Sequence, residues 1–184
     1  DIGDRAAYNQ AHMDRRNGRV KINIEGREVR EGLWVGEGTE RDEEAKINSP
    51  CIIGKNNRIK ANVNIEKYSV IGDYNIINEK SSIKRSIIWK NCIIDKNVQL
   101  RGAVVCNKVH LQDNTSAFEH AIIGDETVIK QNAIIEPNIK IWPNKLVEMG
   151  VEVNSNLVWG SKCVRSIFGN RGITGEINVG ITPE

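Results

Sequence analysis

A six-residue spacing of aliphatic side chains is the feature of this sequence that most restricts its fold. Between residues 52 and 72, every sixth position is aliphatic: Ile53, Ile59, Ile65 and Ile71. If three steps shorten to five residues, the series runs from Val35 to Val164, and 21 of its 23 positions are Val, Ile or Leu. The exceptions are Arg41 and Ala117. Because only 39% of the chain is hydrophobic, chance does not produce such a series.

A unit of one short strand and one turn explains this spacing. Side chains alternate between the two faces of a strand, so the aliphatic residue points inward and its neighbours point outward. Gly and Asn recur between the units, as in Gly54-Lys55-Asn56-Asn57, and both tolerate the left-handed backbone of tight corners. Three units close a triangular coil, and the whole series predicts a parallel β-helix of about seven coils.

Three of the units resemble a known repeat. Ile53-Gly-Lys-Asn-Asn-Arg58, Ile71-Gly-Asp-Tyr-Asn-Ile76 and Ile123-Gly-Asp-Glu-Thr-Val128 are similar to the hexapeptide repeat of left-handed parallel β-helices. The resemblance, and not the spacing, implies the left hand. The expected fold is therefore mainly β, with a left-handed parallel β-helix over residues 33–164.

The outward residues differ between the three faces of the predicted prism. On the face of Ile53 and Ile71 they are apolar except for one lysine, whereas on the third face they are almost all polar. All four tryptophans also fall on the apolar face. We interpret this face as a surface for self-association or for docking against another domain, although the N-terminal segment is a further candidate to cover it. The predicted interface residues are Trp34, Ile52, Val70, Ile87, Trp89, Val104, Ile122, Trp142, Leu157 and Trp159.

Residues 1–32 lack the six-residue repeat and instead predict a short helix and a hairpin. Asp4 is a suitable cap for a short helix over residues 5–16, and a hairpin is expected from residues 20–24 to 28–30 with a turn at Glu25-Gly26. The stretch DIGDRAAYNQAHMD resembles the last strand-to-helix piece of sugar-nucleotide pyrophosphorylases. That resemblance implies that Asp1 ligates the catalytic magnesium of the parent enzyme.

Residues 165–184 resemble the opening of phosphomannomutases and phosphoglucomutases, in an extended segment. Phe168-Gly169, Gly172-Ile173 and Gly175 match that opening, as does Thr182-Pro183-Glu184. Thr174 stands where that family has arginine, which argues against a phosphosugar contact there.

The three pieces in this order are similar to bacterial mannose-1-phosphate guanylyltransferase-like fusion proteins. The resemblance implies a β-helix scaffold and oligomerisation domain for a cytoplasmic enzyme that makes a nucleotide-sugar, most plausibly GDP-mannose. In the parent, mannose-1-phosphate would attack the α-phosphate of GTP with the help of magnesium. The glycine-rich phosphate-binding segment is absent from this sequence, so we expect the chain alone to be inactive and to carry no cofactor. Its expected partners are a second copy and the catalytic domain of the parent.

A free-standing hexapeptide-repeat acyltransferase is the alternative, with His120 or His110 as the base. A three-histidine zinc site is disfavoured, because only these two histidines lie in the repeat. Two charged groups are better explained as solvated corners than as further functional sites. They are the basic group Lys55, Arg58 and Lys60, considered for a phosphosugar effector, and the acidic group Glu119, Asp125 and Glu126, considered for catalysis.

Charge and composition exclude several classes of function. A formal charge of +2, with acidic and basic residues interspersed, does not suggest a nucleic-acid protein. No apolar run approaches the roughly 20 residues that span a bilayer, and no secretory signal is expected at the start. Cys51, Cys92, Cys106 and Cys163 contain no C-x-x-C pair, which favours reduced thiols over zinc ligation or a disulfide framework.

Overall fold

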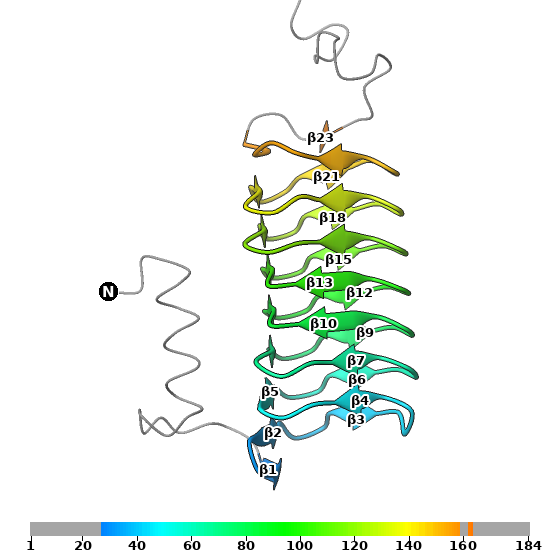
Figure 1. Ribbon diagram of the computed structural model, residues 1–184, viewed down its shortest axis with the longest axis vertical. Coiled ribbons are helices and arrows are strands. Elements are labelled where there is room, and N and C mark those ends of the chain that lie inside the picture. Colours follow the sequence, from blue (N-terminus) through cyan, green and yellow to red (C-terminus); the bar gives the residue numbers. More distant parts are fainter. Residues whose placement is uncertain (1–26, 159–161, 164–184) are drawn as a thin grey trace, which may run out of the picture.

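The computed structural model describes residues 27–158 and 162–163, and every regular element in them is a β-strand. The strands form three sheets that stack as a column of coils (Figure 1). Sheet A contains β1 Arg27–Arg30, β2 Leu33–Val35, β5 Cys51–Ile53, β8 Val70–Ile71, β11 Ile87–Ile88, β14 Val104–Val105, β17 Ile122–Ile123 and β20 Lys140–Ile141. Sheet B contains β3 Glu40–Arg41, β6 Arg58–Ile59, β9 Ile76–Ile77, β12 Ile93–Ile94, β15 His110–Leu111, β18 Val128–Ile129, β21 Leu146–Val147 and β23 Lys162–Cys163. Sheet C contains β4 Lys46–Ile47, β7 Asn64–Ile65, β10 Ser82–Lys84, β13 Gln99–Arg101, β16 Ser116–Ala117, β19 Ile134–Ile135 and β22 Glu152–Val153.

The register of these sheets confirms the predicted repeat. Each strand from β2 on pairs in parallel with the strand one coil away, so that in sheet A Ile53 lies beside Ile71 and Ile71 beside Ile88. The same column continues from Ile88 to Val105 and on to Ile123. Inward aliphatic side chains therefore stack directly over one another along the axis.

The interior is a single dry column. The inward residues of all three sheets, such as Ile65, Ile77 and Ile88, expose 0–1% of their surface. Small or polar residues such as Ser81, Val98 and Thr115 fill the inner side of the corners. Burying an aliphatic side chain stabilises by roughly 1.5–3 kcal/mol, so this repeated column dominates the stability of the fold.

The corners use the left-handed backbone that the Gly and Asn pattern predicted. Positive φ values recur once per corner, for example at Asn56 (φ 51°), Asn114 (φ 59°) and Gly150 (φ 68°). The three shortened steps, which follow Ile83, Leu100 and Val153, all fall at the corner between sheets C and A. At the first two of them, β10 and β13 are three residues long instead of two.

The two ends of the described column depart from the predicted pattern. β1 pairs antiparallel with β2, so residues 28–30 belong to a hairpin that turns at Glu31-Gly32, which was not predicted. Arg41 takes the inward register opposite Ile59 but is exposed, because the first coil leaves the interior open there.

In the last coil the register slips by one residue. Leu157, and not Val158, pairs with Ile141 and packs against the core. The prediction that Leu157 points outward is therefore wrong. The side chain of Asn156 accepts a hydrogen bond from the Lys140 N–H at 2.8 Å, so a side chain takes the donor that a repeating strand would use.

Several predictions fall outside the described residues. They are Asp1 as a metal ligand, the helix over residues 5–16, the strand over residues 20–24, Trp159 in the interface, and the extended segment over residues 165–184.

Candidate functional site

The outward column of sheet A is the strongest candidate for an interaction surface. Ile52, Val70 and Ile122 lie on it and are half-buried, as is Trp34 at its first strand. Ile87 and Val104 are already buried within the single chain, with 4% and 6% exposed. These two positions are therefore not open surface in the single chain.

Two tryptophans extend this apolar column to the corner between sheets A and B. Trp89 and Trp142 each follow an inward isoleucine, and they expose 37% and 55% of their surface. Large exposed indoles are uncommon on solvated surfaces and common in interfaces. The structure thus brings most predicted interface residues to one side of the prism. Its accessible part consists of the half-buried Ile52, Val70 and Ile122 and of the exposed rings of Trp89 and Trp142.

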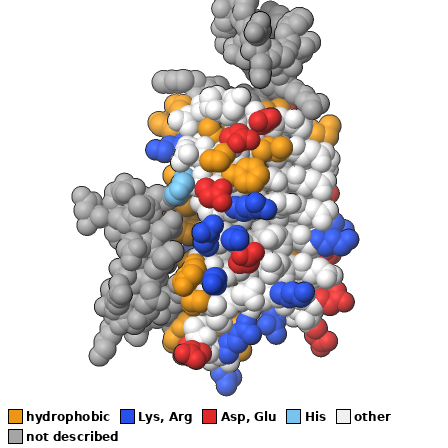
Figure 2. All heavy atoms as spheres, in the orientation of Figure 1, with side chains coloured by type: hydrophobic (Ala, Val, Ile, Leu, Met, Phe, Trp, Pro, Cys, Tyr) orange, Lys and Arg blue, Asp and Glu red, His pale blue; other side chains and the backbone are white. Residues whose placement is uncertain are grey.

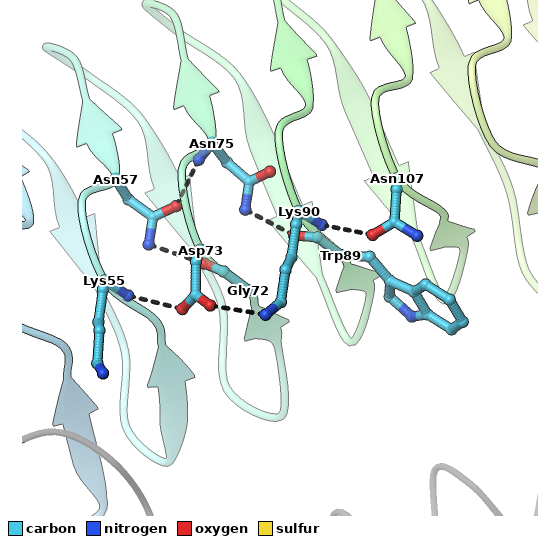
Figure 3. A network of polar contacts seen from close by, with 8 residues as sticks. All are labelled: Lys55, Asn57, Gly72, Asp73, Asn75, Trp89, Lys90 and Asn107. Atoms are coloured by element: carbon cyan, nitrogen blue, oxygen red, sulfur yellow. Dashed lines mark hydrogen bonds and ion pairs between the residues drawn. The ribbon is translucent and has the colours of Figure 1, made fainter.

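At the corner that carries Trp89, the buried Asn57 and Asn75 form a ladder from coil to coil (Figure 3). The Asn57 amide donates to the Gly72 carbonyl and accepts from the Asn75 N–H, both at 2.8 Å. Asn75 in turn donates to the Trp89 carbonyl and accepts from the Cys92 N–H, also at 2.8 Å. A side chain at Gly72 would meet the Trp89 carbonyl at 2.5 Å, so only glycine allows this approach. The ladder satisfies every polar group of both amides and fixes the backbone that carries Trp89.

A second network lies outside the ladder at the same corner. The Asp73 carboxylate accepts from the Lys55 N–H at 2.9 Å and pairs with the Lys90 ammonium at 3.0 Å (Figure 3). Burial opposes ionisation of Asp73, but the Lys55 hydrogen bond and the Lys90 charge outweigh it, and they hold its pKa below the ordinary value. One coil on, the Lys90 N–H donates to Asn107 at 3.3 Å. These contacts hold the corner in one conformation and do not form a reaction centre.

One histidine has the partner that a catalytic base requires. His110 points outward from sheet B, and its Nε2 lies 2.7 Å from Oδ2 of Asp95, which stands at the next corner one coil earlier. Ile93 and Val128 flank His110 in the same outward column. The other candidate base, His120, is exposed at a corner with φ 66° and forms no side-chain hydrogen bond with any residue of 27–158.

The two charged groups weighed from the sequence are dispersed in the structure. Arg58 lies on sheet B and pairs with Glu40 at 3.6 Å. Lys55 lies at the corner before this strand, and Lys60 lies at the corner after it. They do not converge on a common ligand position.

The acidic group is divided in the same way. Asp125 accepts from the Asn107 N–H at 2.7 Å and Glu126 pairs with Lys108 at 2.8 Å, whereas Glu119 lies at a different corner. The acidic residues therefore act as caps and ion-pair partners.

The thiols of the column are unsuited to nucleophilic chemistry. Burial raises the pKa of Cys92 to about 12 and that of Cys106 to about 11, so both are protonated at neutral pH. Among the residues that the structure describes, no group of His, Cys, Asp and Glu is arranged to hold a metal ion. None of the described elements is a helix that could cross a membrane.

Comparisons with known proteins agree with this architecture. No curated protein matches the sequence significantly. Among solved structures, AntD, an N-acyltransferase from Bacillus cereus in complex with dTDP and coenzyme A, is similar with a TM-score of 0.57 and 13% identity, over 61% of this chain and 76% of that one. Two UDP-N-acetylglucosamine acyltransferases are also similar. The enzyme of Francisella novicida has a TM-score of 0.47 and 19% identity over 67% of this chain and 60% of its own, and that of Bacteroides fragilis has 0.48 and 19% over 74% and 68%. At these identities the likeness to AntD shows the fold alone.

The sequence itself identifies the family. Residues 30–135, more than half of the chain, match the family model of the EIF2B subunit epsilon LbH domain, where LbH denotes a left-handed β-helix. This match spans the column from the end of β1 to β19 and confirms the left hand of the coils. The chain belongs to the family of EIF2B subunit epsilon left-handed β-helix domains.

Proposed function

We propose that this chain is the scaffold and assembly domain of a cytoplasmic sugar-nucleotide pyrophosphorylase, most plausibly one that makes GDP-mannose from mannose-1-phosphate and GTP. The family match supports the β-helix part of this proposal. The nucleotidyltransferase and mutase-like resemblances at the two ends of the sequence support the rest.

The observation that carries the assembly role is the difference between the outward columns. Sheet A presents Ile52, Val70 and Ile122 together with the exposed rings of Trp89 and Trp142. A second copy of the chain that covers these side chains removes apolar area from water, at about 25 cal/mol per Å². The corner hydrogen bonds keep Trp89 in place before association, which reduces the entropy lost on binding.

Catalysis in this proposal belongs to a domain that precedes the chain. Asp1 would ligate the magnesium of that domain, which would neutralise charge on the triphosphate as pyrophosphate leaves. The described residues contribute a rigid column that positions the catalytic domains of an oligomer relative to one another.

A second candidate, acyl transfer, is favoured by one specific observation, the 2.7 Å contact between His110 and Asp95. With its proton on Nε2, the imidazole donates to the carboxylate, and Nδ1 is left as the basic nitrogen. An acceptor hydroxyl or amine near Nδ1 would lose its proton to that nitrogen as it attacks the thioester carbonyl. The carbon–sulfur bond would then break, and the imidazolium would return the proton to the leaving thiolate. The exposed Ile93 beside it offers apolar surface to an acyl carrier.

Calorimetric titration and sedimentation together distinguish the two candidates. The scaffold proposal predicts no heat from acetyl-CoA or from GTP with magnesium, and a weight-average mass that rises with protein concentration. Acetyl-CoA binding that is lost in His110→Ala would establish the acyltransferase instead. A chain that binds none of these ligands and stays monomeric at every concentration would contradict both.

A further inference from the structure

The corner between sheets C and A carries a group of cations that the scaffold role does not use. Lys67, Lys84, Arg85 and Arg101, here called the basic corner, lie on three consecutive coils. All except the half-buried Lys84 are exposed. Figure 2 shows Lys and Arg side chains gathered in the middle of the visible face, over the strands around β10 and β13.

Like charges are stacked directly at this corner. Lys84 and Arg101 are partners in the parallel register of β10 and β13. Like charges directly opposite one another destabilise a sheet. Five cations elsewhere are neutralised from the adjacent coil, in the pairs Arg58–Glu40, Lys90–Asp73, Lys96–Glu79, Lys108–Glu126 and Lys130–Glu148. Other cations, such as Lys46, Lys60 and Lys140, form no ion pair within residues 27–158, but the register does not place any of them directly opposite another cation as it does Lys84 and Arg101.

At the basic corner only Lys84 has such a partner, Glu66 at 3.3 Å. The side chains of Lys67, Arg85 and Arg101 form no ion pair with any residue of 27–158. Glu119, half-buried one coil beyond, is the other nearby carboxylate. Within residues 27–158, the corner therefore keeps an excess of positive charge without a partner.

The backbone at Arg85 adopts the left-handed conformation that recurs at the corners of this fold. Arg85 has φ 47°, in the left-handed region, and the equivalent residue one coil on is Gly102 with φ 59°. Left-handed backbone costs a residue with a side chain roughly 1 kcal/mol, so glycine is the stable choice at both positions. The same backbone recurs with other side chains, for example at Lys80 (φ 62°) and Lys108 (φ 54°), so the conformation of Arg85 belongs to the coil geometry. The distinguishing feature of this corner is its grouped positive charge.

Side chains next to these cations can contribute to the binding of a polar partner. The Arg101 guanidinium lies over the Phe118 ring, 5.9 Å from its centroid, and forms no side-chain hydrogen bond with any residue of 27–158. Ser82 and Gln99 point outward from the same two strands and offer hydrogen bonds beside the cations.

We propose that the basic corner binds an acidic segment of a partner protein, on a surface separate from the apolar column of sheet A. The corner of a three-sided prism is convex, so it suits a segment laid across it better than an enclosed small molecule. Three coils span about 10 Å along the axis, which three or four residues of extended chain cover. A short run of Asp or Glu therefore places one carboxylate near each cation.

Nucleic acid fits this surface less well. Duplex DNA carries one charge per roughly 1.7 Å and is bound by long basic stripes, whereas this chain has a net charge of only +2. Glu66 and Glu119 at the edges of the patch would also repel a continuous phosphate backbone.

The test is fluorescence anisotropy with a fluorescein-labelled peptide of eight glutamates, titrated with the full chain at low ionic strength. The double variant Lys84→Gln/Arg101→Gln is expected to weaken binding by about tenfold, since each exposed charge contact contributes up to about 1 kcal/mol. Its matched control is Lys96→Gln/Lys108→Gln, which removes the same charge from the other two corners and is expected to change binding by less than about twofold. Equal weakening in both variants, or no binding by the native chain, would overturn the proposal.

Two further experiments test whether Arg85 has only a structural role and whether the corner prefers another anion. Arg85→Gly is expected to weaken the peptide about threefold while the chain melts no lower, because glycine relieves the left-handed backbone. A lower melting temperature with unchanged binding would show that Arg85 is structural and contradict the proposal. Inorganic phosphate or a single-stranded oligonucleotide that binds more tightly than the peptide would likewise overturn it.

Discussion

Sheets A and C share one interior but have opposite exteriors. Inward, Ile71 of sheet A and Ile83 of sheet C are equally buried, at 1% and 0% exposed. Outward, sheet A carries Val70, Ile87 and Ile122, whereas sheet C carries Asn64, Ser82 and Ser116 at the equivalent positions. Because the residues next to an inward position point away from the core, the core does not dictate their type. The inward residues specify the β-helix, whereas the outward residues of each sheet reflect whether that face contacts solvent or another surface.

The largest effect is expected for the shared interior. Ile71→Ala and Ile83→Ala should each lower the free energy of unfolding by about 2–5 kcal/mol, because each leaves a cavity in a dry, tightly stacked column. The two values should agree despite the different exteriors of their sheets. Denaturant unfolding followed by circular dichroism measures both, and a loss below about 1 kcal/mol for either would show that its sheet does not share the core.

A smaller loss of stability is expected when the side-chain amide of an asparagine is removed, and it should be larger at a buried corner than at an exposed one. Asn75→Ala should destabilise by about 1–3 kcal/mol, since the Trp89 carbonyl and the Cys92 N–H lose their partners inside the column. Asn114→Gly keeps the left-handed backbone and removes an amide whose bonds to Asn97 and Asn132 face solvent. It should cost less than about 0.5 kcal/mol. Equal losses in the two variants would contradict the assignment of the Asn75 ladder as the internal support.

The smallest effect is expected for the loss of folding stability at low pH that is due to Asp73. Because the pKa of Asp73 is lowered in the folded state, its contacts stabilise the fold above about pH 4 and are lost as the pH falls below that value. Asp73→Asn removes the charge but keeps an oxygen for the Lys55 N–H. The variant should therefore lose less stability than the native chain between about pH 5 and pH 2, by under about 1 kcal/mol because Lys90 is largely solvated. Parallel acid dependences of melting temperature would refute this role for Asp73.

The interior of the molecule was predictable because its signal repeats. Each unit such as Ile71–Ile76 repeats the same inward residue and left-handed corner, so many independent positions support one register. The shortened steps after Ile83 and Leu100 could also be placed, because the aliphatic series resumes in phase after them. The left hand came only from the resemblance to known hexapeptide repeats.

The features that the sequence did not reveal depend on single contacts. The His110–Asp95 pair joins residues on different coils, and only the exact register shows that they meet. The slip at Leu157 follows from one hydrogen bond of Asn156, which no periodicity encodes. The burial of Ile87 and Val104 could not be predicted either, because the strand pattern places both side chains on the outward side.

Sedimentation velocity on two matched variants tests most directly the claim that the exterior of sheet A mediates assembly. Ile122→Arg and Ile134→Arg place the same charge on outward positions of sheets A and C, one on β17 and the other on β19. The account predicts that Ile122→Arg weakens self-association by about tenfold or more, because it buries an unpaired charge in the interface, whereas Ile134→Arg matches the native chain. Loss of association in Ile134→Arg alone, or equal association in both variants, would contradict it.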